Sequence, residues 1–368
     1  MTDAGTTIRH CVQCLTPSSR PRVSFDDAGV CNACRFVEAK QSIDWHARHD
    51  EFLKLLDQHR GSGQYDCIVP MSGGKDSASI AYKLKHTYGM HPLCVCYGQL
   101  LWTDAGRHNM DRVAQSVGDI LYWRVDQRVS RVLAKRFTIE RGHPKQHYDA
   151  GVNAVPLQTA VAFQIPLVFY AEHGESEYGG RVLDAESTRH RNLTEVLEHQ
   201  VGDDPGNWVG EGITEADLAP YRYPPNVEGV TAYYWTHFHQ WNVAQNARFC
   251  EEFMGFQYDK RSDGSFVGYD SIDDKIDDLD YHLMAVKFLM GRSTRMASRL
   301  IRYKEMTLAE AREAILKYDY EFPTRYLRDI LDYLDMTYDE LIEVIDMHRN
   351  KELWDRKDGV WVPKFRIP

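Results

Sequence analysis

The residues best suited to chemistry lie in one stretch that we call the phosphate loop: Ser72, Gly73, Gly74, Lys75, Asp76 and Ser77. The preceding residues 67–71 are apolar, as in a buried parallel strand, and the apolar residues after the loop recur at helical spacing. Two adjacent glycines let consecutive backbone N–H groups converge on one anion, and a helix that starts here adds the positive end of its dipole. The stretch therefore predicts a phosphate-binding turn, to which Ser72 and Ser77 add hydroxyls and Lys75 a charge.

Asp76 suits either the first turn of a helix or a magnesium ion carried by a nucleotide. The loop differs from a Walker loop, which needs GxxxxGK followed by Ser or Thr. An ordinary glycine turn is the weaker alternative, because the pattern stands between a strand and a helix. SGGKDS resembles the loop of the PP-loop ATP pyrophosphatases, which split ATP into AMP and pyrophosphate to activate an oxygen for displacement.

Four cysteines form two CxxC pairs, with a separation that is typical of a structural zinc site: Cys11, Cys14, Cys31 and Cys34. Thiolates suit zinc, and two such pairs can complete a tetrahedron. Disulfides are the weaker alternative in a cytosolic chain. The remaining cysteines lie in apolar surroundings that favour buried core positions: Cys67, Cys94, Cys96 and Cys250.

Strand-like runs alternate with helical patterns through the middle of the chain. We expect strands at residues 67–71, 92–97, 120–125, 166–171 and 230–238, and helices at 45–59, 78–85, 110–117, 127–141, 152–163 and 241–254. This alternation predicts an α/β fold, a doubly wound five-stranded parallel sheet with helices on both faces. Such sheets bind ligands at the carboxyl ends of their strands, where the strand order reverses.

A polar, glycine-rich loop, residues 172–180, follows the fourth expected strand. In the strand order 3-2-1-4-5 that is usual for PP-loop enzymes, this loop faces the phosphate loop. Glu175 is then a candidate to hold magnesium or polarise the substrate, and His173 a candidate for proton transfer or phosphate binding. Residues 102–109 form a second polar loop on this edge, either a ligand contact or a helix start capped by Thr103 or Asp104.

The part of the chain after residue 268 reads as an all-helical tail, with capping boxes at Thr307 to Glu310 and Thr337 to Glu340. Within it, Arg292 and Arg295 can reach an anionic substrate. The acidic run at residues 273–280 is interpreted as a solvated helix start.

Composition is that of a globular protein, with 43% hydrophobic and 27% charged residues. The net charge of −10 opposes nucleic acid as the main partner. No long apolar run indicates a membrane span, and residues 1–10 lack the apolar core of a signal peptide, so a cytoplasmic location is expected. We expect three parts: a zinc module at residues 1–40, a PP-loop ATP pyrophosphatase domain at 41–262 and a helical C-terminal domain at 263–368.

The order of five motifs narrows the resemblance. These are CxxC with GVCNAC at the N-terminus, MSGGKDS, GESEYGG at residues 174–180, KIDDLDYHLMAVKFLMGRST at 275–294, and ASRLIR. Together they resemble the N-acetyl sugar amidotransferases of bacterial surface-glycan biosynthesis, such as lipopolysaccharide biosynthesis, the group that contains WbpG and PseA. Two positions depart from the usual pattern: Ser176 stands where that family has Asn, and an acidic residue is common near Arg295.

This resemblance implies an enzyme that uses ATP and Mg²⁺, with Zn²⁺ in the cysteine module, to convert a sugar acetamido group into an acetamidino group. It implies that Lys75, Asp76, Glu175 and His173 are catalytic, that the phosphate loop holds ATP, and that Tyr178 and Arg292 contact the substrate. The acceptor is an N-acetyl sugar or a nucleotide sugar. Ammonia comes from partner chains that resemble the glutaminase and cyclase subunits of imidazole glycerol phosphate synthase, because none of the cysteines here stands in a nucleophile context. A homodimer is one option for the assembly.

The nearest rival is a PP-loop sulfurtransferase that thiolates tRNA or a small molecule. It needs a catalytic thiol near the loop, whereas Cys67, Cys94 and Cys96 lie within expected strands. A nucleotide-binding scaffold without activity is the rival from another class.

Overall fold

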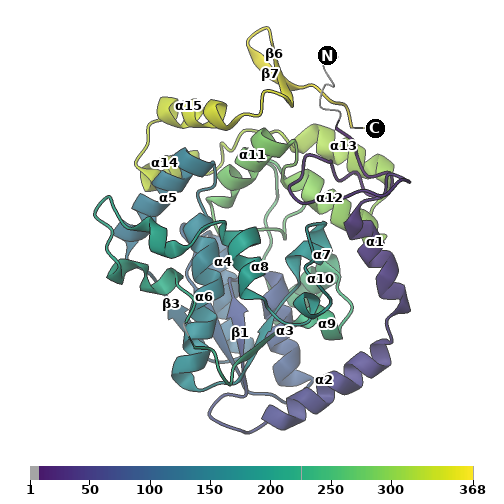
Figure 1. The fold of residues 1–368 in the computed structure, drawn as a ribbon, viewed down its shortest axis with the longest axis vertical. Coiled ribbons are helices and arrows are strands. Elements are labelled where there is room, and N and C mark those ends of the chain that lie inside the picture. Colours follow the sequence, from purple (N-terminus) through teal and green to yellow (C-terminus); the bar gives the residue numbers. More distant parts are fainter. Residues whose placement is uncertain (1–7, 225, 368) are drawn as a thin grey trace.

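The computed structural model describes residues 8–224 and 226–367. A five-stranded parallel sheet lies at its centre, with the strand order β3-β2-β1-β4-β5 (Figure 1). This confirms the predicted doubly wound fold and its strand order. The strands are β1 (Cys67–Met71), β2 (Pro92–Tyr97), β3 (Ile120–Trp123), β4 (Leu167–Tyr170) and β5 (Thr231–Tyr234).

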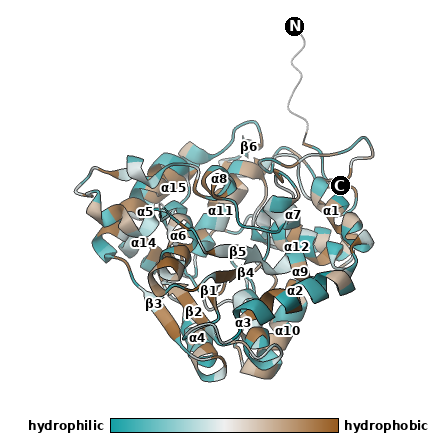
Figure 2. Cartoon of the chain, turned by 60° about the horizontal axis from the view of Figure 1, so that its bottom comes forward, coloured by the Kyte–Doolittle hydropathy of each residue, from teal (hydrophilic) through white to brown (hydrophobic). Residues whose placement is uncertain are grey.

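Alternate residues of each central strand enter different apolar cores, as the two-residue period of a strand requires. On β4, Val168 joins the core on one face of the sheet, and Leu167 and Phe169 join the core on the other. The first face is covered by α5 (Gln127–Arg141), α6 (Gln146–Phe163), α11 (Asp277–Phe288), α14 (Leu327–Leu334) and α15 (Tyr338–His348). The second is covered by α2 (Trp45–His59), α3 (Lys75–His86), α4 (Asp104–Ser116), α9 (Trp235–Phe238), α10 (Val243–Met254) and α12 (Arg292–Arg302). Figure 2 shows the hydrophobic strands enclosed by helices of mixed hydropathy.

Local signals explain where several helices begin. The side chain of Thr103 accepts a hydrogen bond from the Gly106 N–H at 2.9 Å, so α4 starts at Asp104, earlier than the expected residue 110. Both capping boxes are present, at the starts of α13 (Leu308–Tyr318) and α15. The fifth strand is shorter than expected because the chain turns into α9 after Tyr234.

The two ends of the described chain add smaller units. Near the N-terminus, an antiparallel bridge between Phe25 and Cys31 closes the turn that precedes α1 (Asn32–Ala39). At the other end, β6 (Trp354–Lys357) and β7 (Val360–Pro363) form a hairpin, so the prediction of an all-helical tail is wrong there. The turn is Asp358-Gly359, and both residues have positive φ, which an Asp-Gly pair adopts readily.

The segment between β4 and β5 contains α7 (Gly174–Tyr178), α8 (Leu193–Val196) and short helical turns. The C-terminal helices α11 to α13, green in Figure 1, lie above the sheet, and α14 packs on α5. In the described ranges, none of the helices has the length and apolar character needed to cross a membrane.

Candidate active site

A cavity of about 790 Å³ opens at the carboxyl ends of the strands and has the size of a small-molecule site. The ends of β1 and β4 contribute Met71, Ser72 and Glu172. The walls come from α6, α11, α12 and the N-terminal module. The cavity therefore lies between β1 and β4, where the strand order reverses.

The phosphate loop forms part of this cavity through Ser72 and Ser77. Gly73 has a φ of +90°, and a Cβ there would lie 2.9 Å from the carbonyl oxygen of Gly106, so only glycine fits. Helix α3 starts at Lys75, and its N-cap, Gly74, supplies no side-chain cap. The first N–H groups of α3 thus remain available, which fits the cradle of a phosphate group.

Lys75 and Asp76 of the phosphate loop bind each other and do not line the cavity. The Lys75 ammonium lies 2.7 Å from Asp76 Oδ2, and the Asn246 amide donates to Asp76 Oδ1 at 3.0 Å. Both side chains are thereby fixed at the first turn of α3.

Glu175 lines the cavity, but both of its carboxylate oxygens are already engaged. Arg22 donates to them at 3.1 and 3.2 Å, and the Arg181 N–H donates to Oε2 at 2.9 Å. Burial would raise the pKa of Glu175, but the hydrogen bonds and charge of Arg22 lower it overall. A Cβ at Gly180 would lie 1.7 Å from Glu175 Oε2, which explains the glycine there. Glu175 therefore ties its loop to the N-terminal module.

His173 and Tyr178 lie at opposite ends of α7 and differ in exposure to the cavity. His173 is buried outside the cavity lining, accepts from the Ser176 N–H at 3.2 Å, and its Nε2 lies 2.5 Å from Glu195 Oε1. Tyr178 does line the cavity, and its hydroxyl donates to Glu172. His173 therefore stabilises the loop after β4, whereas Tyr178 contacts the cavity in which a ligand can bind.

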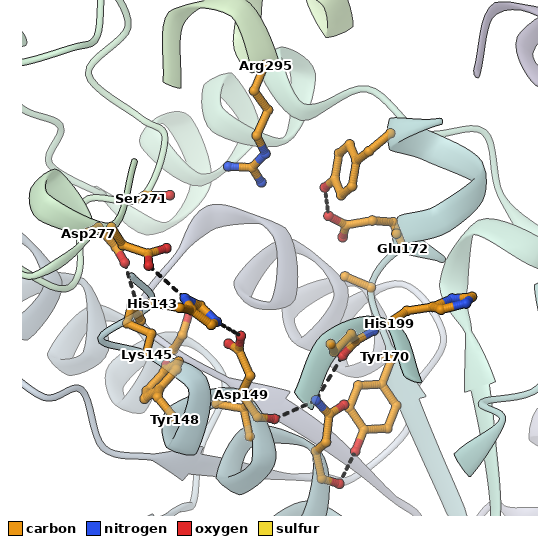
Figure 3. A pocket seen from close by; sticks show the side chains of 18 of the residues that line it. His143, Lys145, Tyr148, Asp149, Tyr170, Glu172, His199, Ser271, Asp277 and Arg295 are labelled. Atoms are coloured by element: carbon orange, nitrogen blue, oxygen red, sulfur yellow. Dashed lines mark hydrogen bonds and ion pairs between the residues drawn. The ribbon is translucent and has the colours of Figure 1, made fainter. Parts of the chain in front are cut away.

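The two arginines that were expected near a substrate, Arg292 and Arg295, differ in their position relative to the cavity. Arg292 is buried and donates to Asp278 Oδ1 at 2.8 Å and to the carbonyl oxygen of Ser271 at 2.7 Å, and it does not line the cavity. Arg295 does line it, and its side chain points into the open space in Figure 3.

Glu172 is a cavity carboxylate that the sequence analysis did not single out. It follows the end of β4 closely, and its Oε1 accepts from Tyr178. Burial raises the pKa of Glu172, and the nearby charge of Asp76 raises it further. The available signal was its position as the first ionisable residue after an apolar strand.

The acidic run at residues 273–280 corrects a second expectation. It is not solvated, because Asp273, Asp274 and Asp277 are buried, and Asp273 and Asp277 line the cavity. The Lys145 ammonium lies 2.5 Å from Asp277 Oδ1 and 3.5 Å from Asp274 Oδ2. Burial raises the pKa of both Asp274 and Asp277 to about 6. Residues that follow β2 in the chain also cover the run, because the Gln99 amide donates to Asp273 at 2.8 Å and the Leu101 N–H donates to Asp274 at 3.0 Å.

His143 lines the cavity together with Lys145 and Asp277 (Figure 3). Its Nδ1 lies 2.7 Å from Asp280 Oδ1, and its Nε2 lies 3.0 Å from Asp149 Oδ2. Burial by itself would lower the pKa of His143, but Asp280 and Asp149 raise it from 6.5 to about 10. The imidazole is thus a cation at neutral pH.

This arrangement predicts a pH dependence of stability. Because the pKa is raised on folding, the stabilisation by His143 is present below pH 6.5 and is lost as the pH rises through about 10. His143→Gln should flatten the decline in the free energy of unfolding across that window, measured by chemical denaturation at a series of pH values. His46→Gln, at an exposed position on α2, is the matched control. Identical profiles for wild type and His143→Gln would contradict the assignment.

The four cysteines of the N-terminal module converge as predicted. All are buried, and their sulfur atoms lie within 4.8 Å of one another. Two of the separations are 3.8 Å, between Cys11 and Cys34, and 3.6 Å, between Cys14 and Cys31. These match the edges of a tetrahedron with zinc–sulfur bonds of about 2.3 Å. The cluster can therefore hold a zinc ion, and the Arg302 guanidinium, 3.4 Å from Cys14 Sγ, offsets thiolate charge.

We expect the purified protein to contain one zinc ion per chain. Cys31→Ser should lose the metal and lower the melting temperature, because this small module has little core of its own. Cys67→Ser, a buried cysteine of β1, is the control and should retain zinc. The zinc content of each variant is measured by mass spectrometry. Zinc retained in Cys31→Ser would contradict the assignment of a four-cysteine zinc site.

The module also forms part of the cavity, through Arg20 and Arg22. The Arg20 guanidinium donates to the carbonyl oxygen of Gly179 at 2.8 Å, and the Asn32 amide donates to that of Gly180 at 2.6 Å. The cysteine module thus holds the loop after β4 and is built into the site.

The cysteines outside the module are buried, and none lines the cavity: Cys67, Cys94, Cys96 and Cys250. Burial raises the pKa of Cys94 to about 12, which disfavours a reactive thiolate. The site therefore offers no thiol for the sulfurtransferase alternative.

Comparison with known proteins adds one finding. Residues 250–366 match the family model described as "LPS biosynthesis protein WbpG-like, C-terminal domain". No curated protein matches the chain. The matched part contains α11 and α12 and with them Asp273, Asp277 and Arg295 of the cavity wall. We call residues 250–366 the WbpG-like domain after this match, which is consistent with the resemblance to the WbpG and PseA group.

Proposed function

We propose that the protein is an ATP-dependent amidotransferase that converts the acetamido group of an N-acetyl sugar into an acetamidino group. One observation carries this proposal: the uncapped phosphate loop opens, at the point where the strand order reverses, into a cavity whose far wall belongs to the WbpG-like domain. The loop fits an anionic leaving group, and the family match favours a sugar of lipopolysaccharide biosynthesis as the acceptor.

The reaction proceeds in two steps. The amide oxygen attacks the α-phosphorus of ATP, and the bond from that phosphorus to the oxygen that bridges to the β-phosphate breaks. Pyrophosphate leaves, and the amide nitrogen gives up its proton to solvent, which yields the adenylated imidate. Ammonia then adds to the imidate carbon and loses a proton, after which the carbon–oxygen bond breaks and AMP leaves. Oxygen thus passes from the acceptor to AMP, and nitrogen takes its place.

The phosphate loop stabilises charge that develops on the leaving pyrophosphate, through backbone N–H groups, Ser77 and Lys75. Asp76 and Glu172 are the carboxylates that we assign to Mg²⁺, an ion that neutralises phosphate charge when bound. Glu172 takes the role expected of Glu175, because Glu172 lines the cavity and accepts from Tyr178, whereas Arg22 ties Glu175 to the cysteine module. Tyr178 faces the acceptor, and His173 positions the loop.

We propose that ammonia reaches the cavity from a separate glutaminase with a cyclase-like subunit. All eight cysteines belong either to the zinc cluster or to buried core positions, so none supplies a glutaminase nucleophile. We also propose a cytoplasmic location, because ATP is a substrate and a four-thiolate zinc site needs reduced cysteines.

The proposal is tested by incubating candidate N-acetyl sugars and nucleotide sugars with the protein, ATP, magnesium and ammonium, followed by mass spectrometry. The expected product differs from its substrate by replacement of one oxygen by NH, and AMP appears in equal amount. AMP formation with incorporation of sulfur from a sulfide donor, or no turnover with any acceptor, would overturn it.

A further inference from the structure

Four arginines recur at intervals of three and four residues along α12: Arg292, Arg295, Arg299 and Arg302. This spacing places them on one face of the helix. Arg292 pairs with Asp278 at one end, and Arg302 contacts Cys14 of the zinc cluster at the other. Between them, Arg295 lines the cavity and Arg299 is buried. Arg295 and Arg299 therefore take part in neither of these two contacts at the ends of α12.

One buried carboxylate lies among these cations without hydrogen-bond geometry. Asp270 is 2% exposed, and its nearest guanidinium nitrogens are at 3.6 Å on Arg295, 3.8 Å on Arg299 and 4.0 Å on Arg292. Its Oδ2 is buried without a hydrogen-bond partner among the described residues. Burial would raise the pKa of Asp270, but these arginines and Lys75 lower it overall. Lys75 and Arg292 have closer carboxylate partners in Asp76 and Asp278, so Asp270 is the carboxylate left to offset the charges of Arg295 and Arg299.

Arg299 is a buried side chain with unused hydrogen-bond donors. It is 1% exposed, and its Nε and Nη2 have no hydrogen-bond partner within the described part of the chain. Its guanidinium lies over the Tyr178 ring at 4.6 Å, and its charge partly offsets the rise that burial causes in the pKa of Glu172. Buried donors left unpaired are costly, and an anion that accepts from them recovers that cost.

We propose that Lys75, Arg295 and Arg299 form one cationic site for the polyphosphate end of a nucleotide, and that Asp270 is the internal counterion that holds the two arginines until the nucleotide binds. This inference rests on the proposed use of ATP. The N-terminus of α3 and the arginine face of α12 then grip the phosphates from two sides, so the WbpG-like domain supplies half of the nucleotide site. Guanidinium groups suit this task because their paired donors match phosphate oxygens.

The test uses Asp270→Asn and inorganic pyrophosphate as the probe, with Asp278→Asn as the matched control. Asp278 is equally buried and pairs with Arg261 and Arg292, which do not line the cavity. Thermal unfolding should show that both variants are less stable than wild type without ligand. Only Asp270→Asn should gain affinity, with a Kd for pyrophosphate lower by roughly tenfold, because one competing negative charge is gone.

Arg295→Lys and Arg299→Lys keep the charge and lose the paired donors, so each should raise the Kd by roughly tenfold. These variants also decide the matter if Asp270→Asn does not fold. Unchanged pyrophosphate affinity in both arginine variants, or a weakened response to the acceptor alone, would overturn the cationic site and leave the proposed function intact. Arginine-dependent pyrophosphate binding without any amidino product would instead overturn the proposed function and leave this site standing.

Discussion

Asp76→Ala is expected to abolish pyrophosphate release from ATP while the protein stays folded. Asp76 lies in the first turn of α3, where its carboxylate holds the Lys75 ammonium at 2.7 Å and accepts from Asn246 at 3.0 Å. Its side chain is 21% exposed, so its removal leaves no large cavity. The substitution removes a metal contact and frees Lys75 from its fixed position. Loss of one preorganised electrostatic group of this kind lowers turnover by about 100-fold or more.

The measurement is a coupled pyrophosphate assay with an accepted sugar, alongside the melting temperature. Asp111→Ala, at an exposed position on α4, is the control and should retain full turnover. Normal turnover in Asp76→Ala would contradict the role assigned to the phosphate loop in pyrophosphate release. An unfolded variant would be replaced by Asp76→Asn, which preserves the shape of the side chain.

Glu172→Gln is expected to lower turnover by roughly 100-fold with little change in stability, whereas Glu175→Gln should lower stability first. Glu172 lies in the cavity with only Tyr178 as its hydrogen-bond donor among the described residues. Glu175 instead accepts two hydrogen bonds from Arg22 of the cysteine module. Its neutralisation leaves that guanidinium without its counterion and loosens the module.

The pH dependence gives a second measure of Glu172. Because burial and Asp76 raise its pKa above the ordinary 4.5, kcat/KM should fall on the acid side at a pH above that value. Glu172→Gln should lack this acid limb in its residual activity. Equal turnover for wild type and Glu172→Gln, or loss of activity only in Glu175→Gln, would reverse the two roles.

Local patterns made most of the sheet predictable. The boundaries of β1, β2, α2 and α5 agree with the expected ranges, because apolar periodicity and turn residues act within a few positions. The zinc cluster was predictable for the same reason, since the CxxC spacing itself limits where the sulfur atoms can lie.

Contacts between distant segments were not predictable. Nothing near Glu175 in the sequence shows that Arg22, 153 positions away, occupies both of its oxygens. The burial of Asp273 depends on Gln99, whose amide reaches it at 2.8 Å across 174 positions. The spacing of the arginines on α12 was visible in the sequence. Their contact with Asp270 and the position of Arg295 at the cavity, which suggest an anion site, became visible only in the structure.

The central claim is that the phosphate loop uses ATP to activate an acetamido oxygen. The most direct test labels that carbonyl oxygen of the acceptor with a heavy isotope and follows the label by mass spectrometry after turnover with ATP and ammonium. The account predicts that the heavy oxygen appears in the phosphate group of AMP and that the acceptor loses it as nitrogen is gained. Label that stays in the acceptor, or that appears in inorganic phosphate while AMP carries none, would contradict the account.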